Sequence, residues 1–423
     1  MRVLVVGGGG REHALAWGLA QSPRVGEVIA APGNAGISQI ASCLPVEAED
    51  LEGLVELAEA RDIDLVVVGP EGPLVAGLAD SLRGRGRAVF GPDSDAARVE
   101  GSKAWAKELM ARGGVPTARA GAFTSVEPAE AFVEELGGRA VVKADGLAAG
   151  KGVTVAQDHE TAAAAIRLCL EEGVFGDAGT TVVVEEVLEG PEVSAFALCD
   201  GSTTVPLVLS QDFKRIGDGD VGSNTGGMGA HSPLPFVDAA TEATIWDLAS
   251  RTVATMAAEG ITYRGLLYLG LMLTQEGPKV LEYNCRFGDP ETEVVVPRLR
   301  TDLAELLYAC ATGSLADVKL DWSEEAAVSV VLASAGYPGD YRTGVPIEGL
   351  DEAAAVDGAL VFHSGTRNRD GRVVTAGGRV LAVSALGTTR AEARTRAYEA
   401  CSRVSFEGMQ LRTDIAADKE PSR

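Results

Sequence analysis

The sequence predicts a multidomain protein of mixed α/β and α+β class, with a parallel sheet near the N-terminus and a β-rich C-terminal domain. Its 423 residues exceed the roughly 100–200 residues of an ordinary single domain. The first hundred residues alternate between short apolar strands and helical segments, whereas the last ninety return to valine-rich strands punctuated by glycine. These observations separate an N-terminal, a central and a C-terminal region.

The N-terminal region shows apolar runs that end in glycine-rich turns, and a helical segment follows the first run. The strands are expected at Val3–Val6, Val25–Ala30, Leu65–Val68 and Ala88–Phe90, and the helix at Arg11–Gln21. Strands that alternate with helices form parallel sheets, whose ligand-binding loops follow the carboxyl ends of the strands. We therefore expect a binding crevice at that edge.

The central region begins near Ser102 and has a different pattern. Strands are expected at Ala140–Lys143, Val153–Ala156, Thr180–Glu185, Gly265–Thr274 and Pro278–Asn284, and helices at Thr161–Glu172 and Asp238–Glu259. The loop between the first two strands is interpreted as a flexible cover. The C-terminal region predicts strands at Val328–Ala333 and Val380–Val383 and shows few clustered polar groups.

The charge balance excludes several classes of partner. The formal net charge is −24, and only eight of the 37 basic residues are lysines. An acidic chain is a poor binder of nucleic acid and of anionic membranes, because both need basic side chains. Six scattered cysteines and the absence of a long apolar run predict reduced thiols and a cytoplasmic location.

The first glycine turn, Gly7–Gly10, is not a dinucleotide fingerprint, because Glu12 or His13 stands where the third glycine belongs. We expect its backbone amides to bind a single phosphate or another anion, although a tight turn without a ligand fits it too. Two more turns at the same sheet edge, Gly33–Gly36 and Gly69–Pro73, favour the binding crevice.

The segment from Lys143 to Gly152 is more specific. Lys143 ends a strand, and the following Gly/Ala loop carries Lys151, which suits a polyphosphate, although the spacing is not that of a Walker A motif. Downstream, the acidic pair Glu185–Glu186 ends a strand. It fits either the adenine edge and ribose of a nucleotide, with Glu192 beyond it, or a solvated acidic turn.

Glu282 and Asn284 stand two apart on a predicted strand, so both side chains point to one face. A carboxylate and an amide oxygen suit Mg²⁺ that also bridges nucleotide phosphates. Arg286 is expected on the same face, where it could bind a carboxylate or phosphate. The long glycine-rich stretch from Gln211 to Ala230 is expected to be functional or disordered, and the histidines to be structural.

In order along the chain, the motifs GGGGREH, PGNAG, VGPEGPL, EGSKA, VKADGLAAGKG, SQDFKR, NTGGMGA and EYNCRFGDPE resemble those of the phosphoribosylamine–glycine ligases, also called glycinamide ribonucleotide synthetases. The resemblance spans residues 1 to about 410. It implies an N-terminal α/β domain (1–101), an ATP-grasp domain (102–325, with a mobile lid at about 122–187) and a C-terminal β-rich domain (326–423).

The resemblance also implies the reaction, in which ATP, glycine and 5-phospho-β-D-ribosylamine give glycinamide ribonucleotide through a glycyl phosphate in purine biosynthesis. Mg²⁺ or Mn²⁺ is the implied metal, bound by Glu282 and Asn284. The implied ATP-binding residues are Lys103, Lys143, Gly150, Lys151, Gly152, Glu185, Glu186, Val187 and Glu192. The implied substrate-binding residues are Gly9, Gly33, Asn34, Gly36, Pro70, Glu71, Asn224, Gly227, Met228, Asp289 and Pro290. Arg286, Asp212 and Lys214 are expected near the reacting groups.

Three other functions remain open from the residues. Another ATP-grasp ligase, such as a carboxylating enzyme, would share most motifs; a nicotinamide-dependent oxidoreductase depends only on the first glycine turn. A nucleotide-sensing module would bind ATP without turnover, but binding alone needs neither the metal pair nor the cationic loop. Partners are expected to be small molecules, with no nucleic acid and no membrane, and the chain to be a monomer or weak dimer.

Overall fold

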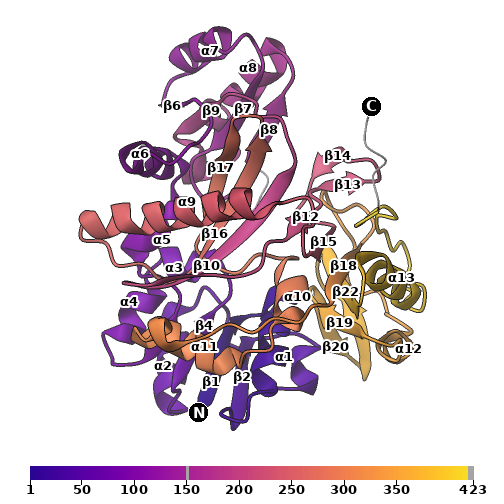
Figure 1. The fold of residues 1–423 in the computed structure, drawn as a ribbon. Coiled ribbons are helices and arrows are strands. Elements are labelled where there is room, and N and C mark those ends of the chain that lie inside the picture. Colours follow the sequence, from indigo (N-terminus) through magenta and orange to yellow (C-terminus); the bar gives the residue numbers. More distant parts are fainter. Residues whose placement is uncertain (149–151, 418–423) are drawn as a thin grey trace.

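The computed structural model describes residues 1–148 and 152–417 and confirms the predicted fold class. Figure 1 shows the N-terminal elements at the bottom, a small subdomain with helices α7 and α8 at the top, and the C-terminal elements at the right. Within the described ranges, no helix combines the length and apolar character needed to cross a membrane.

The N-terminal sheet is parallel throughout, as predicted, with the strand order β3-β2-β1-β4-β5. Its strands are β1 (Arg2–Gly7), β2 (Glu27–Pro32), β3 (Ser42–Cys43), β4 (Leu65–Val68) and β5 (Ala88–Phe90). The accompanying helices are α1 (Gly10–Ala20), α2 (Leu51–Ala60), α3 (Glu71–Val75), α4 (Leu78–Arg83) and α5 (Ser94–Gly101). Alternate residues of each strand face opposite sides. In β1, Val3 and Val5 enter one hydrophobic cluster, whereas Leu4 and Val6 enter another.

Helix α6 (Lys103–Gly113) leads into the small subdomain, an antiparallel sheet covered by two helices. The sheet order is β6-β9-β7-β8, with β6 (Ala120–Phe123), β7 (Ala140–Ala144), β8 (Val153–Ala156) and β9 (Val182–Glu185). The two helices are α7 (Val126–Glu135) and α8 (His159–Leu170). Helix α8 begins and ends two residues earlier than predicted. Strand β9 starts two residues later than predicted, after a 3₁₀ turn at Gly176–Gly179.

The central antiparallel sheet has the order β11-β10-β16-β17 and contributes to the same two cores as the N-terminal sheet. Its strands are β10 (Glu192–Asp200), β11 (Thr204–Pro206), β16 (Arg264–Thr274) and β17 (Gly277–Asn284). Helix α9 (Ala239–Ala258) contacts β10, β11 and β17. Helices α10 (Thr292–Val295) and α11 (Leu303–Thr312) follow this sheet.

The C-terminal sheet has the order β12-β15-β18-β22-β19 and takes its first two strands from the middle of the chain. Its strands are β12 (Gln211–Asp212), β15 (Gly229–Ser232), β18 (Ala326–Ala333), β19 (Ala359–His363) and β22 (Arg379–Gly387). Helices α12 (Leu350–Ala354) and α13 (Arg390–Cys401) accompany it, together with a ribbon of β20 (Thr366–Arg369) and β21 (Arg372–Thr375).

The glycine-rich stretch after residue 211 is ordered, which decides one alternative that the sequence left open. β13 (Arg215–Gly217) pairs with β14 (Val221–Asn224) in a two-stranded hairpin between β12 and β15. Figure 1 shows this hairpin at the upper right, above the C-terminal sheet.

Candidate active site

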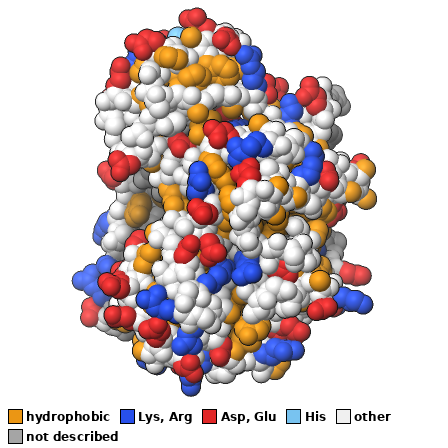
Figure 2. All heavy atoms as spheres, turned by 90° about the vertical axis from the view of Figure 1, so that its left-hand side faces the viewer, with side chains coloured by type: hydrophobic (Ala, Val, Ile, Leu, Met, Phe, Trp, Pro, Cys, Tyr) orange, Lys and Arg blue, Asp and Glu red, His pale blue; other side chains and the backbone are white. Residues whose placement is uncertain are grey.

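One large cleft, with a volume of about 1210 Å³, joins all three regions of the chain. Sixteen of the residues implied by the resemblance line it: Pro70, Glu71, Lys103, Lys143, Gly152, Glu185, Glu186, Val187, Glu192, Asp212, Lys214, Asn224, Glu282, Asn284, Arg286 and Asp289. On the face shown in Figure 2, basic and acidic side chains are interspersed. The lysines that could hold an anionic ligand are gathered locally in the cleft.

Two lysines share one buried carboxylate in the inner part of the cleft. The Nζ atoms of Lys143 and Lys107 lie 3.1 Å and 3.2 Å from Oε1 of Glu185, which is 2% exposed. Lys143 also donates to the carbonyl of Leu281, 3.0 Å away, at the residue that the β16–β17 register skips. Burial lowers the pKa of Lys107 to about 8, although Glu185 opposes that effect. The cluster therefore places two ammonium groups in the cleft, and a bound polyphosphate could pair with them in place of Glu185.

Lys103 lies one helical turn before Lys107 on helix α6, since four residues separate them. Ser102 caps this helix by accepting a hydrogen bond from the Trp105 amide. The Nζ of Lys103 donates to the carbonyls of Asp145 and Gly146 at the end of β7, at 3.3 Å and 3.0 Å. Burial lowers the pKa of Lys103, and the nearby Glu282 carboxylate opposes this. Lys103 therefore ties helix α6 to the start of the loop after β7.

Glu282 and Asn284 point to one face of β17, as predicted from their spacing. Burial alone would raise the pKa of Glu282, but Lys214, Lys143 and Lys103 outweigh it and lower the pKa. The Nζ of Lys214 lies 3.9 Å from Glu282 and 2.8 Å from Glu192. Glu282 is therefore an ionised carboxylate within the reach of three ammonium groups.

Glu282 and Asn284 fit a divalent cation. The donor set is a carboxylate and an amide oxygen, both typical of hard cations, and Glu282 is held in the ionised form that a ligand needs. No group of three or more His, Cys, Asp or Glu side chains in the described parts of the chain could hold a metal by itself. Mg²⁺ bound through phosphate oxygens and water needs only one or two protein oxygens.

Asp212, on β12, lines the cleft two residues before Lys214. Burial raises its pKa to about 7, against the opposing effect of Lys214, and the carboxylates of Glu291 and Glu192 raise it further. Such a carboxyl is close to half ionised at neutral pH, which is the condition for accepting a proton there.

Arg286 connects the end of β17 to the N-terminal region. Its Nε lies 3.2 Å from Oε2 of Glu71, and its Nη2 lies 3.1 Å from Oε1 of the buried Glu100 and 3.3 Å from Oδ1 of Asn284. Burial raises the pKa of Glu100, with Arg286 opposing. The guanidinium is thus fixed between two carboxylates and directed toward the candidate metal residue.

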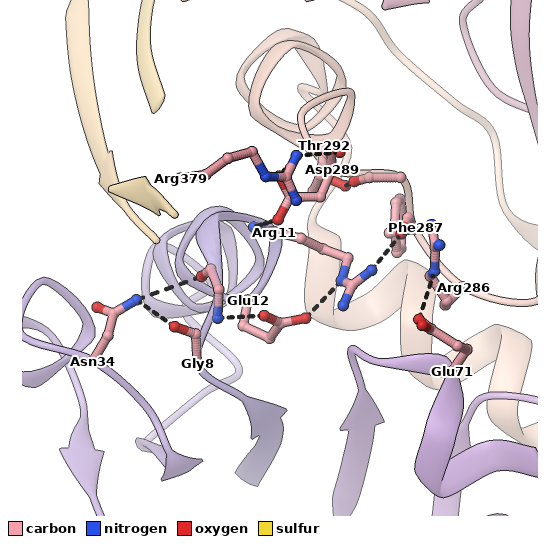
Figure 3. Close-up of polar contacts among 12 residues, drawn as sticks. Gly8, Arg11, Glu12, Asn34, Glu71, Arg286, Phe287, Asp289, Thr292 and Arg379 are labelled. Carbon is pink, nitrogen blue, oxygen red and sulfur yellow. Dashed lines mark hydrogen bonds and ion pairs between the residues drawn. The ribbon is translucent and has the colours of Figure 1, made fainter. Parts of the chain in front are cut away.

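The chain's own carboxylates bind backbone amides at the first glycine turn, so the expectation of free amides is wrong at Gly9, and the Arg11 amide just after the turn is occupied too (Figure 3). The amide of Gly9 donates to Oε2 of Glu12 at 2.5 Å, and the amide of Arg11 lies 3.4 Å from Oδ2 of Asp289. Nε of Arg11 binds the other oxygen of Glu12 at 2.6 Å. The start of α1 is therefore already supplied with negative charge.

Several implied substrate residues do not line the cleft. Asn34 donates to the carbonyls of Gly8 and His363 and accepts from the amides of Gly36 and Ile37, so it joins two regions of the chain. Gly33 and Gly36 leave room for Cys43 and for the rings of His13 and His363. Gly227 packs against Pro290, and the side chain of Met228 is fully buried. Gly150 and Lys151 lie outside the described residues.

Sequence reasoning missed several charged residues of the cleft, among them Glu100, Lys107, Glu291 and Arg379. Lys107 had a local signal, since it stands four residues after Lys103 on a helix. Arg379, on β22, lies 3.0 Å from Asp289 and donates to the carbonyl of Gly226 at 2.7 Å. The C-terminal region shows few clustered polar groups in the sequence, yet long-range folding brings its Arg379 and Arg390 into the cleft lining.

Comparison with known proteins places these features in one family. The family models of phosphoribosylglycinamide synthetase match residues 1–100 (N domain), 101–292 (ATP-grasp (A) domain) and 327–418 (C domain). The phosphoribosylamine–glycine ligase of Streptomyces coelicolor is 53% identical over 421 residues, covering 99% of each chain. That of Rhizobium meliloti is 51% identical over 416 residues, covering 98% of each.

Solved structures agree. The crystal structure of phosphoribosylamine–glycine ligase from Thermotoga maritima has a TM-score of 0.86 and 37% identity, covering 98% of this chain and all of that one. Biotin carboxylase from Campylobacter jejuni, at 15% identity and a TM-score of 0.75, covering 98% of this chain and 94% of that one, shares the fold alone. The chain belongs to the phosphoribosylglycinamide synthetase family.

Proposed function

We propose that the protein uses ATP to ligate glycine to 5-phospho-β-D-ribosylamine, giving glycinamide ribonucleotide, ADP and phosphate in purine biosynthesis. The observation that carries the proposal is the convergence of Lys214, Lys143 and Lys103 on the ionised Glu282. A reaction that brings a carboxylate to a polyphosphate must neutralise two anions, and this arrangement supplies the charges.

Each of the three regions that meet at the cleft is proposed to bind a different part of the substrates. Residues 1–101 hold phosphoribosylamine with Pro70 and Glu71, residues 102–325 hold ATP, with a lid at about 122–187, and residues 326–423 complete the substrate side. Lys103, Lys143 and Gly152 bind the phosphates, while Glu185, Glu186, Val187 and Glu192 surround the base and ribose. Gly9, Gly33, Asn34, Gly36, Asn224, Gly227, Met228, Asp289 and Pro290 are proposed to shape the phosphoribosylamine side.

Glu282 and Asn284 would hold Mg²⁺ or Mn²⁺, which when bound lowers the charge on the ATP phosphates. In the first step, the glycine carboxylate oxygen forms a bond to the γ-phosphorus, and the bond to the ADP oxygen breaks. Lys143 and Lys214 offset the negative charge that this step brings together. Arg286 would orient the carboxylate with its planar fork.

In the second step, the amine of phosphoribosylamine attacks the glycyl carbonyl carbon, the C–N bond forms, and the C–O bond to phosphate breaks. The attacking nitrogen must lose a proton. We assign its acceptance to Asp212, whose pKa of about 7 suits a base at neutral pH. We place the reaction in the cytoplasm, with small molecules as its only partners.

Omission assays test the proposal. Without a trapping agent, repeated turnover to ADP should require ATP, glycine, phosphoribosylamine and a divalent cation together. Hydroxylamine in place of phosphoribosylamine should trap the glycyl phosphate as glycine hydroxamate. Bicarbonate that replaces glycine would instead indicate a carboxylating relative, and ATP binding without ADP formation would indicate a sensing module.

A further inference from the structure

Arg412, close to the C-terminal end of the described chain, is the largest side chain that is fully buried. Its Nε and Nη2 each lie 2.7 Å from an oxygen of Asp414, and its Nη1 lies 2.8 Å from Oδ1 of Asp220 on the β13–β14 hairpin. Burying a guanidinium is costly unless its donors are satisfied. Here two carboxylates and a carbonyl satisfy it.

The guanidinium contacts both chain neighbours of Lys214. It lies over the ring of Phe213, 5.1 Å from the ring centroid, and donates from Nη1 to the carbonyl of Arg215 at 3.1 Å. Arg412 itself does not line the cleft, whereas Asp212, Phe213, Lys214 and Arg215 do. The guanidinium therefore reaches the cleft through its partners, namely the segment that carries Lys214, and Asp220, which also lines the cleft.

The segment around Arg412 is held firmly on its other side by helix α13. The Tyr398 hydroxyl donates to the carbonyl of Arg412 at 2.8 Å, and Nε of Arg394 donates to the carbonyl of Ile415 at 2.9 Å. Burial would raise the pKa of Asp414, but hydrogen bonds from Arg412 and the Gly219 amide lower it to about 2. The carboxylate that orients Arg412 is thus ionised under all ordinary conditions.

We propose that Arg412 is a positioning residue for Lys214: it fixes Phe213 and Arg215 and so sets the ammonium of Lys214 against Glu192 and Glu282. A lysine side chain has many rotamers, and its placement depends on a rigid backbone on both sides. The proposal rests on the proposed function, in which Lys214 acts at the reacting groups.

A double-mutant cycle tests this coupling with the full-length enzyme. Arg412→Met should lower kcat about tenfold or more while leaving the KM for ATP within about threefold, because the phosphate lysines are untouched. In a Lys214→Met background, Arg412→Met should change kcat by less than about threefold. Arg412→Lys should recover part of the activity, because it keeps the charge but loses the planar fork.

Arg396→Met is the matched control. Arg396 lies on helix α13, the helix that holds the segment around Arg412. It binds Asp357, Glu392 and the carbonyl of Leu386, none of which belongs to the β13–β14 hairpin. Its kcat should stay within about twofold of wild type. If Arg412→Met does not fold, Asp414→Asn takes its place in the same cycle.

Equal losses from Arg412→Met in the wild-type and Lys214→Met backgrounds, or no loss in either, would overturn the proposal. A wild-type enzyme without glycine-dependent ADP formation would instead overturn the proposed function. The two failures are therefore distinguishable.

Discussion

Oε2 of Glu71 lies 3.2 Å from Nε of Arg286, so the start of helix α3 is joined directly to the chain just after β17. The guanidinium also binds Glu100, from the helix between these regions, at 3.1 Å. A single side chain thus fixes the N-terminal region against the strand that carries Glu282 and Asn284.

Arg286→Met should lower the free energy of unfolding by about 3–5 kcal/mol, because it leaves the buried Glu100 without its cation. Arg342→Met, which removes an exposed pair with Glu407, should cost less than about 1 kcal/mol. Urea denaturation of the two variants measures the difference. Equal costs would show that the Glu71–Arg286–Glu100 cluster does not stabilise the junction.

Glu282→Ala should reduce kcat/KM by on the order of 100-fold or more, because the carboxylate at the centre of the three lysines is lost. Its circular dichroism spectrum should match that of wild type, and excess Mg²⁺ should not restore turnover. Glu276→Ala, an exposed change in the turn before the same strand, is the control and should be silent. Wild-type kinetics of Glu282→Ala at saturating Mg²⁺ would refute the metal assignment.

Lys107 predicts a pH dependence of ATP affinity. With its pKa lowered to about 8 by burial, the ammonium is charged at pH 7 and loses its proton as the pH rises through 8. The affinity for a fluorescent ATP analogue should therefore fall, and its Kd rise, between pH 7 and 9. Lys107→Arg should flatten that limb, because guanidinium stays charged. Parallel profiles for wild type and variant would contradict a role of Lys107 in phosphate binding.

His13 predicts a loss of stability in acid. Nδ1 of His13 accepts a hydrogen bond from the amide of His363 at 2.7 Å, so the ring is neutral in the folded protein. Burial, and secondarily His363, lower the pKa of His13 to about 3. The unfolded chain therefore binds the proton first, and stability that is present above pH 6.5 is lost as the pH falls.

The contribution of His13 to this loss is about 2 kcal/mol between pH 7 and pH 5. His13→Asn keeps an acceptor at the same place and cannot titrate. Between pH 7 and pH 5, the unfolding free energy of this variant should therefore fall by about 2 kcal/mol less than that of the wild type. Identical pH profiles would show that His13 is already protonated in the folded state.

Local patterns predicted part of the fold well. The strands Leu65–Val68, Ala88–Phe90 and Val153–Ala156 have the predicted bounds, because each is a short apolar run between clear turn signals. The pairing of β15 with β18, nearly a hundred residues later, could not be predicted, because strand pairing across such a separation leaves no local signature. The β13–β14 hairpin was hidden for a similar reason: its glycines suit a loop equally well.

Some residues of the candidate site could likewise be predicted from local motifs, whereas others could not. Lys103, Lys143, Glu185 and Glu282, which stand in or next to short sequence motifs, line the cleft. Such residues can be found from the sequence, because each motif places its side chains within a few consecutive residues. The contact of Asp289 with the Arg11 amide could not be predicted, since Asp289 lies in a distant part of the chain; the contact of Glu12 with the Gly9 amide is local and had a signal in the Glu three residues after the N-cap. Arg379 binds Asp289, and Arg412 binds Asp220 as well as its near neighbour Asp414; nothing near either arginine in the sequence marks the distant partner.

The most direct test of the proposed reaction is the fate of oxygen from the glycine carboxylate. With glycine labelled by ¹⁸O in both carboxylate oxygens, the complete reaction should yield inorganic phosphate that carries one ¹⁸O atom, measured by mass spectrometry. That transfer occurs only if the carboxylate attacks the γ-phosphorus and the amine later displaces the phosphate. Unlabelled phosphate formed together with glycinamide ribonucleotide would contradict the acyl phosphate route.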